Sequence, residues 1–130
     1  MRKAVVMMLL AVASSSVMAD WVEMFSDADG NITYTDPATI RRAGDTTEIW
    51  DMTDFKKVQL FRVGEKYRSI MKQHEYDCTE ARWRLLAIFA YANSMGKGEV
   101  VASDSNPDSW APLVPGSREA TIWKVACAKK

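Results

Sequence analysis

The residues that could support catalysis are few, and their spacing does not assemble a catalytic pair. The chain has one histidine, His74, and the nearest serine, Ser69, lies five positions before it. Along a strand, residues an odd number of positions apart point to opposite faces, which separates this serine from a histidine base. Paired carboxylates could cleave glycosides, and two pairs have suitable spacing: Asp51 with Asp54, and Glu75 with Asp77. Such spacings are common on solvated strands, and we expect that the protein is not an enzyme.

Metal and phosphate sites are not expected either. One histidine and two cysteines are too few soft ligands for a self-contained structural zinc site. Gly96-Lys97-Gly98 lacks the ending and the spacing of a phosphate-binding loop and suits a hairpin turn. The segment 104–108 resembles the first half of a calcium loop, but Ser109 replaces its glycine and Pro115 its bidentate glutamate. We therefore expect no metal and no cofactor.

Basic residues give the most specific binding hypothesis. If two neighbouring strands pair as a hairpin around residues 78–80, five basic side chains could share one face and bind polyanions or acidic protein segments. This basic stripe consists of Lys66, Arg68, Lys72, Arg82 and Arg84. The alternative is a solvated face whose charges pair with Glu48, Asp51 and Glu75. From residue 20 onward the chain has 15 basic and 17 acidic residues, and this net charge of −2 argues against nucleic-acid binding.

Residues 1–19 have the pattern of a secretory signal peptide. Arg2 and Lys3 precede ten apolar residues, and a small-residue tail leads to a cleavage site before Asp20. As a helix, ten residues span only about 15 Å, half of a bilayer core, which disfavours the alternative of an uncleaved anchor. We expect a signal peptide (1–19) followed by one exported domain (20–130), periplasmic or secreted to the cell surface. It would have no transmembrane segment after cleavage and no cysteine at residue 20 to carry a lipid.

The two cysteines are expected to pair in an oxidising compartment. Cys78 and Cys127 would close a loop of about 50 residues, which stabilises the fold by about 4 kcal/mol in the chain-entropy model. The alternative is a redox or nucleophilic cysteine. It is disfavoured because there is no C-x-x-C motif, and because His74 would lie about 13 Å from Cys78 along a strand.

The pattern along the exported part predicts an α+β fold: a six-stranded antiparallel meander with one C-terminal helix. The expected strands are 21–25, 32–35, 46–52, 67–77, 82–91 and a short run at 100–101. Residues 56–64 could extend the third strand or form a loop, and 82–91 also has a helical interpretation. Alternation places the charged face of 66–74 toward solvent. A helix capped by Ser117 would bury Ile122, Trp123, Ala126 and Cys127 against the sheet.

An ordered set of residues across nearly all of the exported part resembles the surface-adhesin protein E family. The set comprises Trp21, Tyr34-x-Asp36-x-x-x-Ile40, Ile49-Trp50-x-Met52-x-Asp54, Tyr67-x-Ser69, Asp77-Cys78, Tyr91, Met95-Gly96-x-Gly98, Trp110, Pro112-x-x-Pro115-Gly-Ser117 and Trp123-x-x-x-Cys127. The resemblance implies the same sheet, helix and Cys78–Cys127 bridge. It also implies a non-enzymatic protein that binds host extracellular-matrix or serum glycoproteins and can form a homodimer. Family adhesins are lipid-anchored, whereas Asp20 stands here in place of an anchoring cysteine.

The first hypothesis is therefore an exported non-enzymatic binding protein that contacts a protein partner through the basic stripe. The second is a soluble periplasmic accessory protein that binds another envelope protein or a small ligand. A hydrolase ranks last, because the sequence offers no convincing triad or metal cluster.

Overall fold

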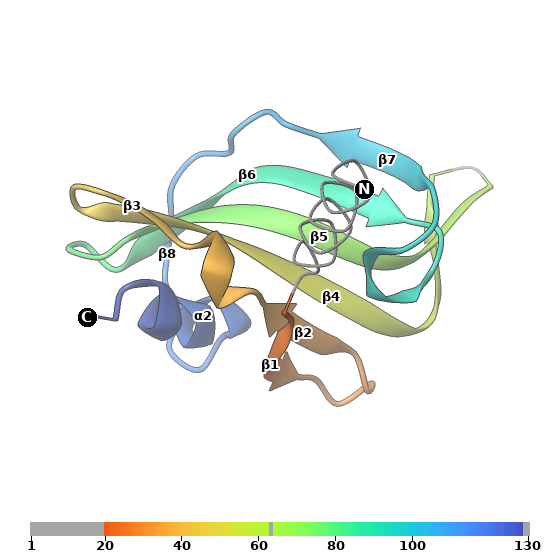
Figure 1. The fold of residues 1–130 in the computed structure, drawn as a ribbon, viewed down its shortest axis with the longest axis horizontal. Coiled ribbons are helices and arrows are strands. Elements are labelled where there is room, and N and C mark those ends of the chain that lie inside the picture. The colour runs from red at the N-terminus through yellow and green to blue at the C-terminus, as the bar shows by residue number, and fades with distance from the viewer. Residues whose placement is uncertain (1–19, 63, 129–130) are drawn as a thin grey trace, which may run out of the picture.

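An antiparallel sheet forms the body of the protein, and the computed structural model describes residues 20–62 and 64–128 (Figure 1). The main path of the sheet follows the order β1-β2-β4-β5-β6-β7. The strands are β1 (Val22–Ser26), β2 (Ile32–Thr35), β3 (Arg41–Ala43), β4 (Thr46–Phe61), β5 (Glu65–Asp77), β6 (Arg82–Tyr91), β7 (Val100–Asp104) and β8 (Ala111–Pro112). The helices are α2 (Arg118–Ala126) and the 3-10 turns η1 (Pro37–Thr39) and η2 (Ser94–Gly96). The predicted signal peptide lies outside the described residues.

The predicted meander is confirmed as the six-strand main path, and two short strands extend it to eight. β3 pairs with the same strand, β4, as β2 does, and β8 pairs with the start of β6. Residues 56–61 continue β4 as a strand, and residues 82–91 form a strand in place of the helical alternative. β5 on one side, and β7 and β8 on the other, supply backbone partners to β6, so pairing decides its conformation.

A bulge in β6 changes which of its residues share a face. Gln73 lies opposite Ala87 and His74 lies opposite Leu85, so Leu86 has no partner on β5. Simple alternation would group Trp83 with Phe89, but Trp83 lies on the side of α2 because the extra residue shifts the pattern. The His74 and Trp83 rings meet edge to face, with 5.1 Å between their centroids.

The helix α2 covers one end of one sheet face. As predicted, the Ser117 side chain accepts a hydrogen bond from Ala120 N (3.1 Å) and begins the helix. The core beneath α2 consists of Ile49, Tyr76, Ile122 and Ala126. Cys127 forms the predicted disulfide with Cys78, at a Cα–Cα distance of 5.5 Å. None of the helices among the described residues is long and apolar enough to cross a bilayer.

The prediction that the charged face of β5 looks at solvent is wrong for most of that face. His74 is 1% exposed and Ile70 is buried. Ile49, which packs against α2, lies directly opposite His74 in the β4–β5 ladder. Counting charges on one strand cannot show which face a helix will cover, because that choice depends on the neighbouring strands. The prediction concerned Lys66, Arg68, Ile70, Lys72 and His74.

A buried polar pair lies on this core face. His74 Nδ1 is 2.5 Å from Asp51 Oδ2, and both residues are 1% exposed. The Tyr76 ring meets His74 edge to face, at 5.8 Å between centroids. Burial raises the pKa of Tyr76, so its phenol stays neutral. Each member of the pair depends on the other, because a buried polar group without a partner is destabilising.

Near the N-terminal end of the described chain, Asp36 organises the segment after β2. One of its carboxylate oxygens accepts a hydrogen bond from Ala38 N (3.0 Å) and caps η1. The other accepts one from Asp20 N at 3.4 Å. Asp36 therefore connects the start of the domain to the turn that leads into β3.

Loss of the disulfide is expected to lower the free energy of unfolding by about 4 kcal/mol. The reason is that the bond joins cysteines 49 positions apart and so restricts the conformations of the unfolded chain. The variant is Cys78→Ser with Cys127→Ser, and urea unfolding measures the change. The native protein with its bond reduced serves as control and should unfold at the same urea concentration as the variant. An unchanged midpoint in the double variant would contradict this.

Removal of one member of the buried pair is expected to destabilise the fold more than replacement of both. Asp51→Ala leaves His74 buried without its polar partner, at a cost of roughly 2–4 kcal/mol. Asp51→Leu combined with His74→Phe restores apolar packing and should cost less than the two single changes together. Urea unfolding of the variants measures this. Asp108→Ala, at an exposed position, is the control; strictly additive costs would show that the two side chains do not interact.

Candidate functional site

An open groove lies on the same sheet face as α2, beyond the end that the helix covers. It encloses about 510 Å³ and is lined by the end of β4, by β5, β6 and β7, and by the residues after β7. Ile70, Ala90 and Ala102 lie opposite one another on adjacent strands and form an apolar floor together with Ile88. Small alanine side chains on two of the strands leave this space open. An apolar floor of this size suits a hydrophobic side chain or a small ligand.

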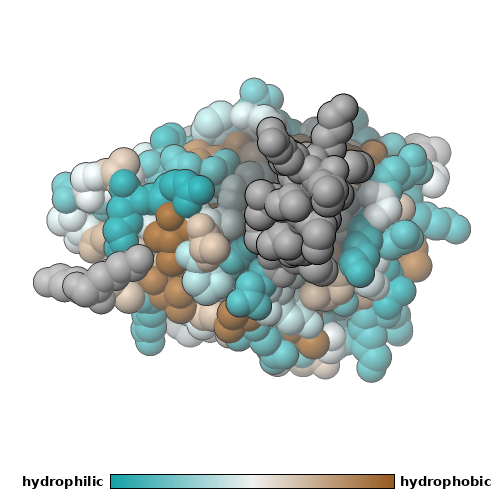
Figure 2. All heavy atoms as spheres, in the orientation of Figure 1, coloured by the Kyte–Doolittle hydropathy of each residue, from teal (hydrophilic) through white to brown (hydrophobic). Residues whose placement is uncertain are grey.

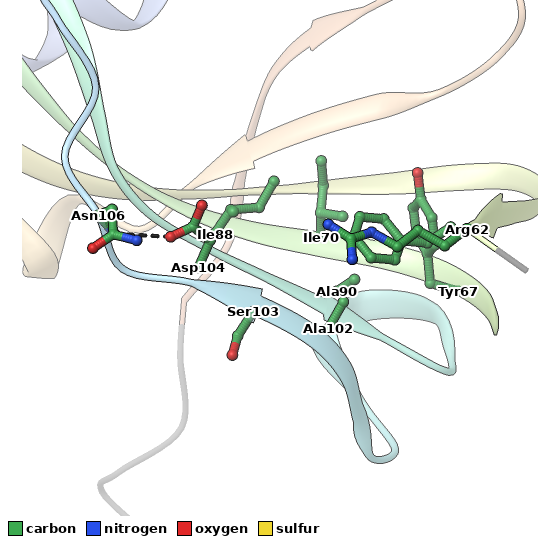
Figure 3. A pocket seen from close by; sticks show the side chains of 10 residues that line it. Arg62, Tyr67, Ile70, Ile88, Ala90, Ala102, Ser103, Asp104 and Asn106 are labelled. Atoms are coloured by element: carbon green, nitrogen blue, oxygen red, sulfur yellow. Dashed lines mark hydrogen bonds between the residues drawn. The ribbon is translucent and has the colours of Figure 1, made fainter.

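The two ends of the groove differ in charge. Figure 3 shows Arg62 and Tyr67 at one end and Asp104 with Asn106 at the other, with the apolar floor between them. Asp104 Oδ1 accepts a hydrogen bond from Asn106 N (2.9 Å) and holds the loop at its end. The groove therefore fits an apolar group with negative charge on the Arg62 side and positive charge on the Asp104 side.

Arg62 reaches the groove from a strained backbone position. Its φ is 54°, in the left-handed region that residues with side chains rarely adopt. Its guanidinium lies 5.3 Å from the centroid of the Phe61 ring. Strain of this kind persists where the surrounding structure holds a side chain in place, often at functional sites.

The groove borders a sheet edge. β7 pairs with β6 on one side and ends the strand order on the other. Its outer backbone groups can therefore pair with an extended segment of another protein. The edge and the apolar floor together make this region of the described chain suitable for peptide binding.

A second hollow, of about 360 Å³, lies on the opposite face of the sheet. Trp50 and Phe89 line it, with 6.0 Å between their ring centroids. The other lining residues are Trp21, Asp36, Thr39, Met71 and Tyr91. We call it the aromatic hollow.

The predicted basic stripe does not form one face. The turn between β5 and β6 sets a register in which Arg82 lies opposite Asp77 and Arg84 lies opposite Glu75. Lys72, which lies opposite Asp51 on the side of α2, projects from the other face. The sequence could not reveal this register, because one residue more or less in the turn reverses it.

Arg82 and Arg84 are engaged within the protein. Arg82 Nε is 2.9 Å from Asp77 Oδ2, and Arg84 Nε is 2.7 Å from Glu75 Oε1. Both guanidinium groups lie over the Trp110 ring, at 4.6 and 4.7 Å from its centroid. The alternative hypothesis, in which the basic residues pair with carboxylates of the same protein, is correct for Glu75. The second arginine, Arg82, pairs with Asp77 and not with Glu48 or Asp51.

The three basic residues on β5 differ in availability. Arg68 donates to the backbone oxygens of Phe55 (2.7 Å) and Lys56 (3.0 Å). Lys72 is largely covered, and burial, followed by the nearby charge of Arg118, lowers the pKa of its amine. Lys66 alone of the three is exposed.

The residues considered for catalysis have structural roles. Ser69 Oγ donates to Asn93 O (2.6 Å) and accepts from Gly96 N (2.8 Å), on the face opposite His74. Asp51 and Asp54 lie on opposite faces, and Asp54 accepts from Met95 N. No group of three or more metal-ligating side chains occurs within residues 20–62 and 64–128. The groove could not be predicted from the sequence, because the residues of its floor are ordinary apolar ones that only strand register brings together.

The family model of surface-adhesin protein E matches residues 21–128. The chain belongs to this family. Membership of a family of surface adhesins indicates that the protein is exported or lies at the cell surface, with an adhesin-like role. A search of curated protein sequences finds no significant match.

Solved structures of Haemophilus influenzae protein E share the fold. Crystal form II aligns with a TM-score of 0.68 at 15% identity and covers 86% of this chain and 90% of that one. A second structure aligns with a TM-score of 0.66 at 14% identity and covers 86% of each chain. Protein E from a non-typeable strain aligns with a TM-score of 0.61 at 14% identity and covers 85% and 74%. At these identities the likeness establishes the fold alone.

Loss of the Asp77 charge is expected to weaken the fold at neutral pH and not in acid. Hydrogen bonds from Arg82 and from Glu80 N lower the pKa of Asp77 in the folded protein. Its stabilising contribution is therefore present above the unfolded pKa and is lost as pH falls through the folded pKa. Asp77→Asn should unfold at lower urea concentration than the native protein at pH 7, and this gap should close in acid. Asp108→Asn is the control, and a gap that persists in acid would contradict the expectation.

Proposed function

We propose that the protein is an exported, non-enzymatic binding protein that takes a segment of a protein partner in the groove. The open groove with its apolar floor, charged ends and adjoining free edge strand carries this proposal. Membership of the surface-adhesin protein E family supports it, because adhesins act by binding. The groove replaces the basic stripe as the main contact surface, since four of the five basic residues are engaged or covered within the protein.

The proposed partner is a host extracellular-matrix or serum glycoprotein, as expected for an adhesin of this family. Such a partner would place an aliphatic side chain on Ile70 and Ile88 and align its backbone with β7. An acidic residue of the partner would face Arg62, and a basic one would face Asp104. In this arrangement, main-chain hydrogen bonds to β7 supply affinity, and the charged ends of the groove orient the partner.

The second candidate is a periplasmic accessory protein that binds another envelope protein or a small ligand. The volume of the groove, about 510 Å³, is within the usual range for small-ligand pockets and favours this alternative. Localisation distinguishes the two functions. Antibody staining of intact cells supports the adhesin, whereas protein found only in the periplasmic fraction supports the accessory role.

Blocking the groove is expected to weaken partner binding by roughly tenfold or more, because a central contact would be lost. The variant is Ala102→Trp, which fills the floor, and binding to immobilised vitronectin and laminin measures the effect. Ala43→Trp places the same side chain at an exposed position of β3 and is the matched control. Circular dichroism confirms that both variants are folded. Equal binding by native protein and Ala102→Trp would remove the groove from the proposed function.

A further inference from the structure

The far end of the β4–β5 hairpin leaves the body of the sheet. β2 pairs with β4 only as far as Asp54, and β6 pairs with β5 only as far as Ser69. Beyond these residues the two strands pair with each other alone, from Gln59 opposite Tyr67 to Phe61 opposite Glu65. We call residues 55–62 and 64–68 the distal ribbon. Figure 1 shows it at the opposite end of the molecule from α2.

The distal ribbon concentrates positive charge: four of the eight exposed basic residues in the described part of the chain lie in it. The segment 55–68 has five basic residues and one acidic residue, a net charge of +4. The remaining residues from Asp20 onward have ten basic and sixteen acidic ones, a net charge of −6. Within the described residues, no carboxylate forms an ion pair with Lys56, Lys57, Arg62 or Lys66. Such a charge distribution orients the ribbon toward an anionic surface and the rest of the molecule away from it.

Aliphatic side chains are exposed among these cations. Leu60 is 70% exposed and Val58 is 55% exposed. Leu60 lies directly opposite Lys66 in the ladder, so an apolar side chain and an ammonium group project from the same side of the ribbon. Figure 2 shows hydrophobic and hydrophilic residues side by side at this end of the surface. A purely ionic partner would leave the aliphatic groups in water.

The surface that receives both kinds of group is the interface of an anionic bilayer. Lipid phosphates attract lysine and arginine, and the boundary between headgroups and acyl chains accepts aliphatic side chains. The long stems of lysine let the charge stay at the phosphates while neighbouring apolar groups reach deeper. A soluble polyanion such as a sulfated glycan offers the charge without the apolar layer.

We propose that the distal ribbon is a peripheral membrane-binding element: Val58 and Leu60 enter the headgroup boundary of an anionic bilayer, and Lys56, Lys57 and Lys66 contact lipid phosphates. The five residues of this attachment do not line the groove, although Arg62 and Tyr67 of the distal ribbon form one end of it. It holds the protein at a lipid surface by one end, with the α2 end directed away. It is reversible and weakens with salt, because it depends on screened charges and a small apolar area.

Vesicle sedimentation tests the proposal on the full chain, purified in one N-terminal form that intact mass defines, so that residues 1–19 contribute equally in every variant. We expect binding to vesicles of equal parts phosphatidylcholine and phosphatidylglycerol that falls with added salt, and little binding to phosphatidylcholine alone. Lys57→Ser with Lys66→Ser should weaken binding about 25-fold, about fivefold for each charge removed. Val58→Ser with Leu60→Ser should weaken it roughly tenfold.

Matched controls separate the ribbon from general surface effects. Lys97→Ser with Lys124→Ser removes two exposed charges elsewhere, and Val22→Ser with Val114→Ser removes two exposed valines elsewhere. Both controls should bind like the native protein. The proposal is overturned by absent or lipid-independent binding, or by equal losses in controls and ribbon variants. Binding that depends on Lys57 and Lys66 but not on Val58 and Leu60 would also overturn it and would indicate a simple polyanion site.

Discussion

The bond between Cys78 and Cys127 determines where α2 lies, and the rest of the surface follows from that placement. A helix of nine residues is too short to be stable alone in water. The bond holds it at the end of β5, and Trp123 Nε1 adds a hydrogen bond to Asp77 O at 3.0 Å. One end of the sheet face is therefore closed over Ile49 and Tyr76. Among residues 20–62 and 64–128 no helix lies above the other end, and there the apolar floor remains open.

Polar residues mark the transition between the closed and open ends of this face. The Asp51–His74 pair lies on it, and Lys72 lies beside Asp51 in the β4–β5 ladder. The burial of Asp51 and His74, beside the largely covered Lys72, is tolerated because these polar side chains have one another as neighbours. Apolar residues in their place would join the core under α2 to the floor of the groove in one continuous layer. The polar row thus separates the apolar core under α2 from the apolar floor of the groove.

The sequence was sufficient to predict the features that depend on local chemistry. The strands at 32–35 and 82–91, the helix cap at Ser117 and the disulfide are all present as predicted. These follow from β-branched runs, an N-cap residue and a simple cysteine count. Each can be judged from a few neighbouring residues.

Features that depend on register could not be predicted in the same way. Arg82 faces Asp77 because of the length of one turn, and Trp83 packs beside His74 because of one bulged residue. The groove requires Ile70, Ala90 and Ala102 to align across three strands, and no one of these residues is distinctive. The exposure of Leu60 follows from the extension of its strand past the neighbouring strands, which the sequence does not show.

The contact between Asp20 N and Asp36 bears on the predicted cleavage before Asp20. In an uncut chain this nitrogen is a neutral amide. Cleavage before Asp20 would turn it into a free amino group, which has an ordinary pKa of about 8 and is mostly protonated at neutral pH. The new terminus would then be a cation beside a carboxylate that is almost fully shielded from water. Processing would thereby add an ion pair and fasten the trimmed end of the chain to the domain.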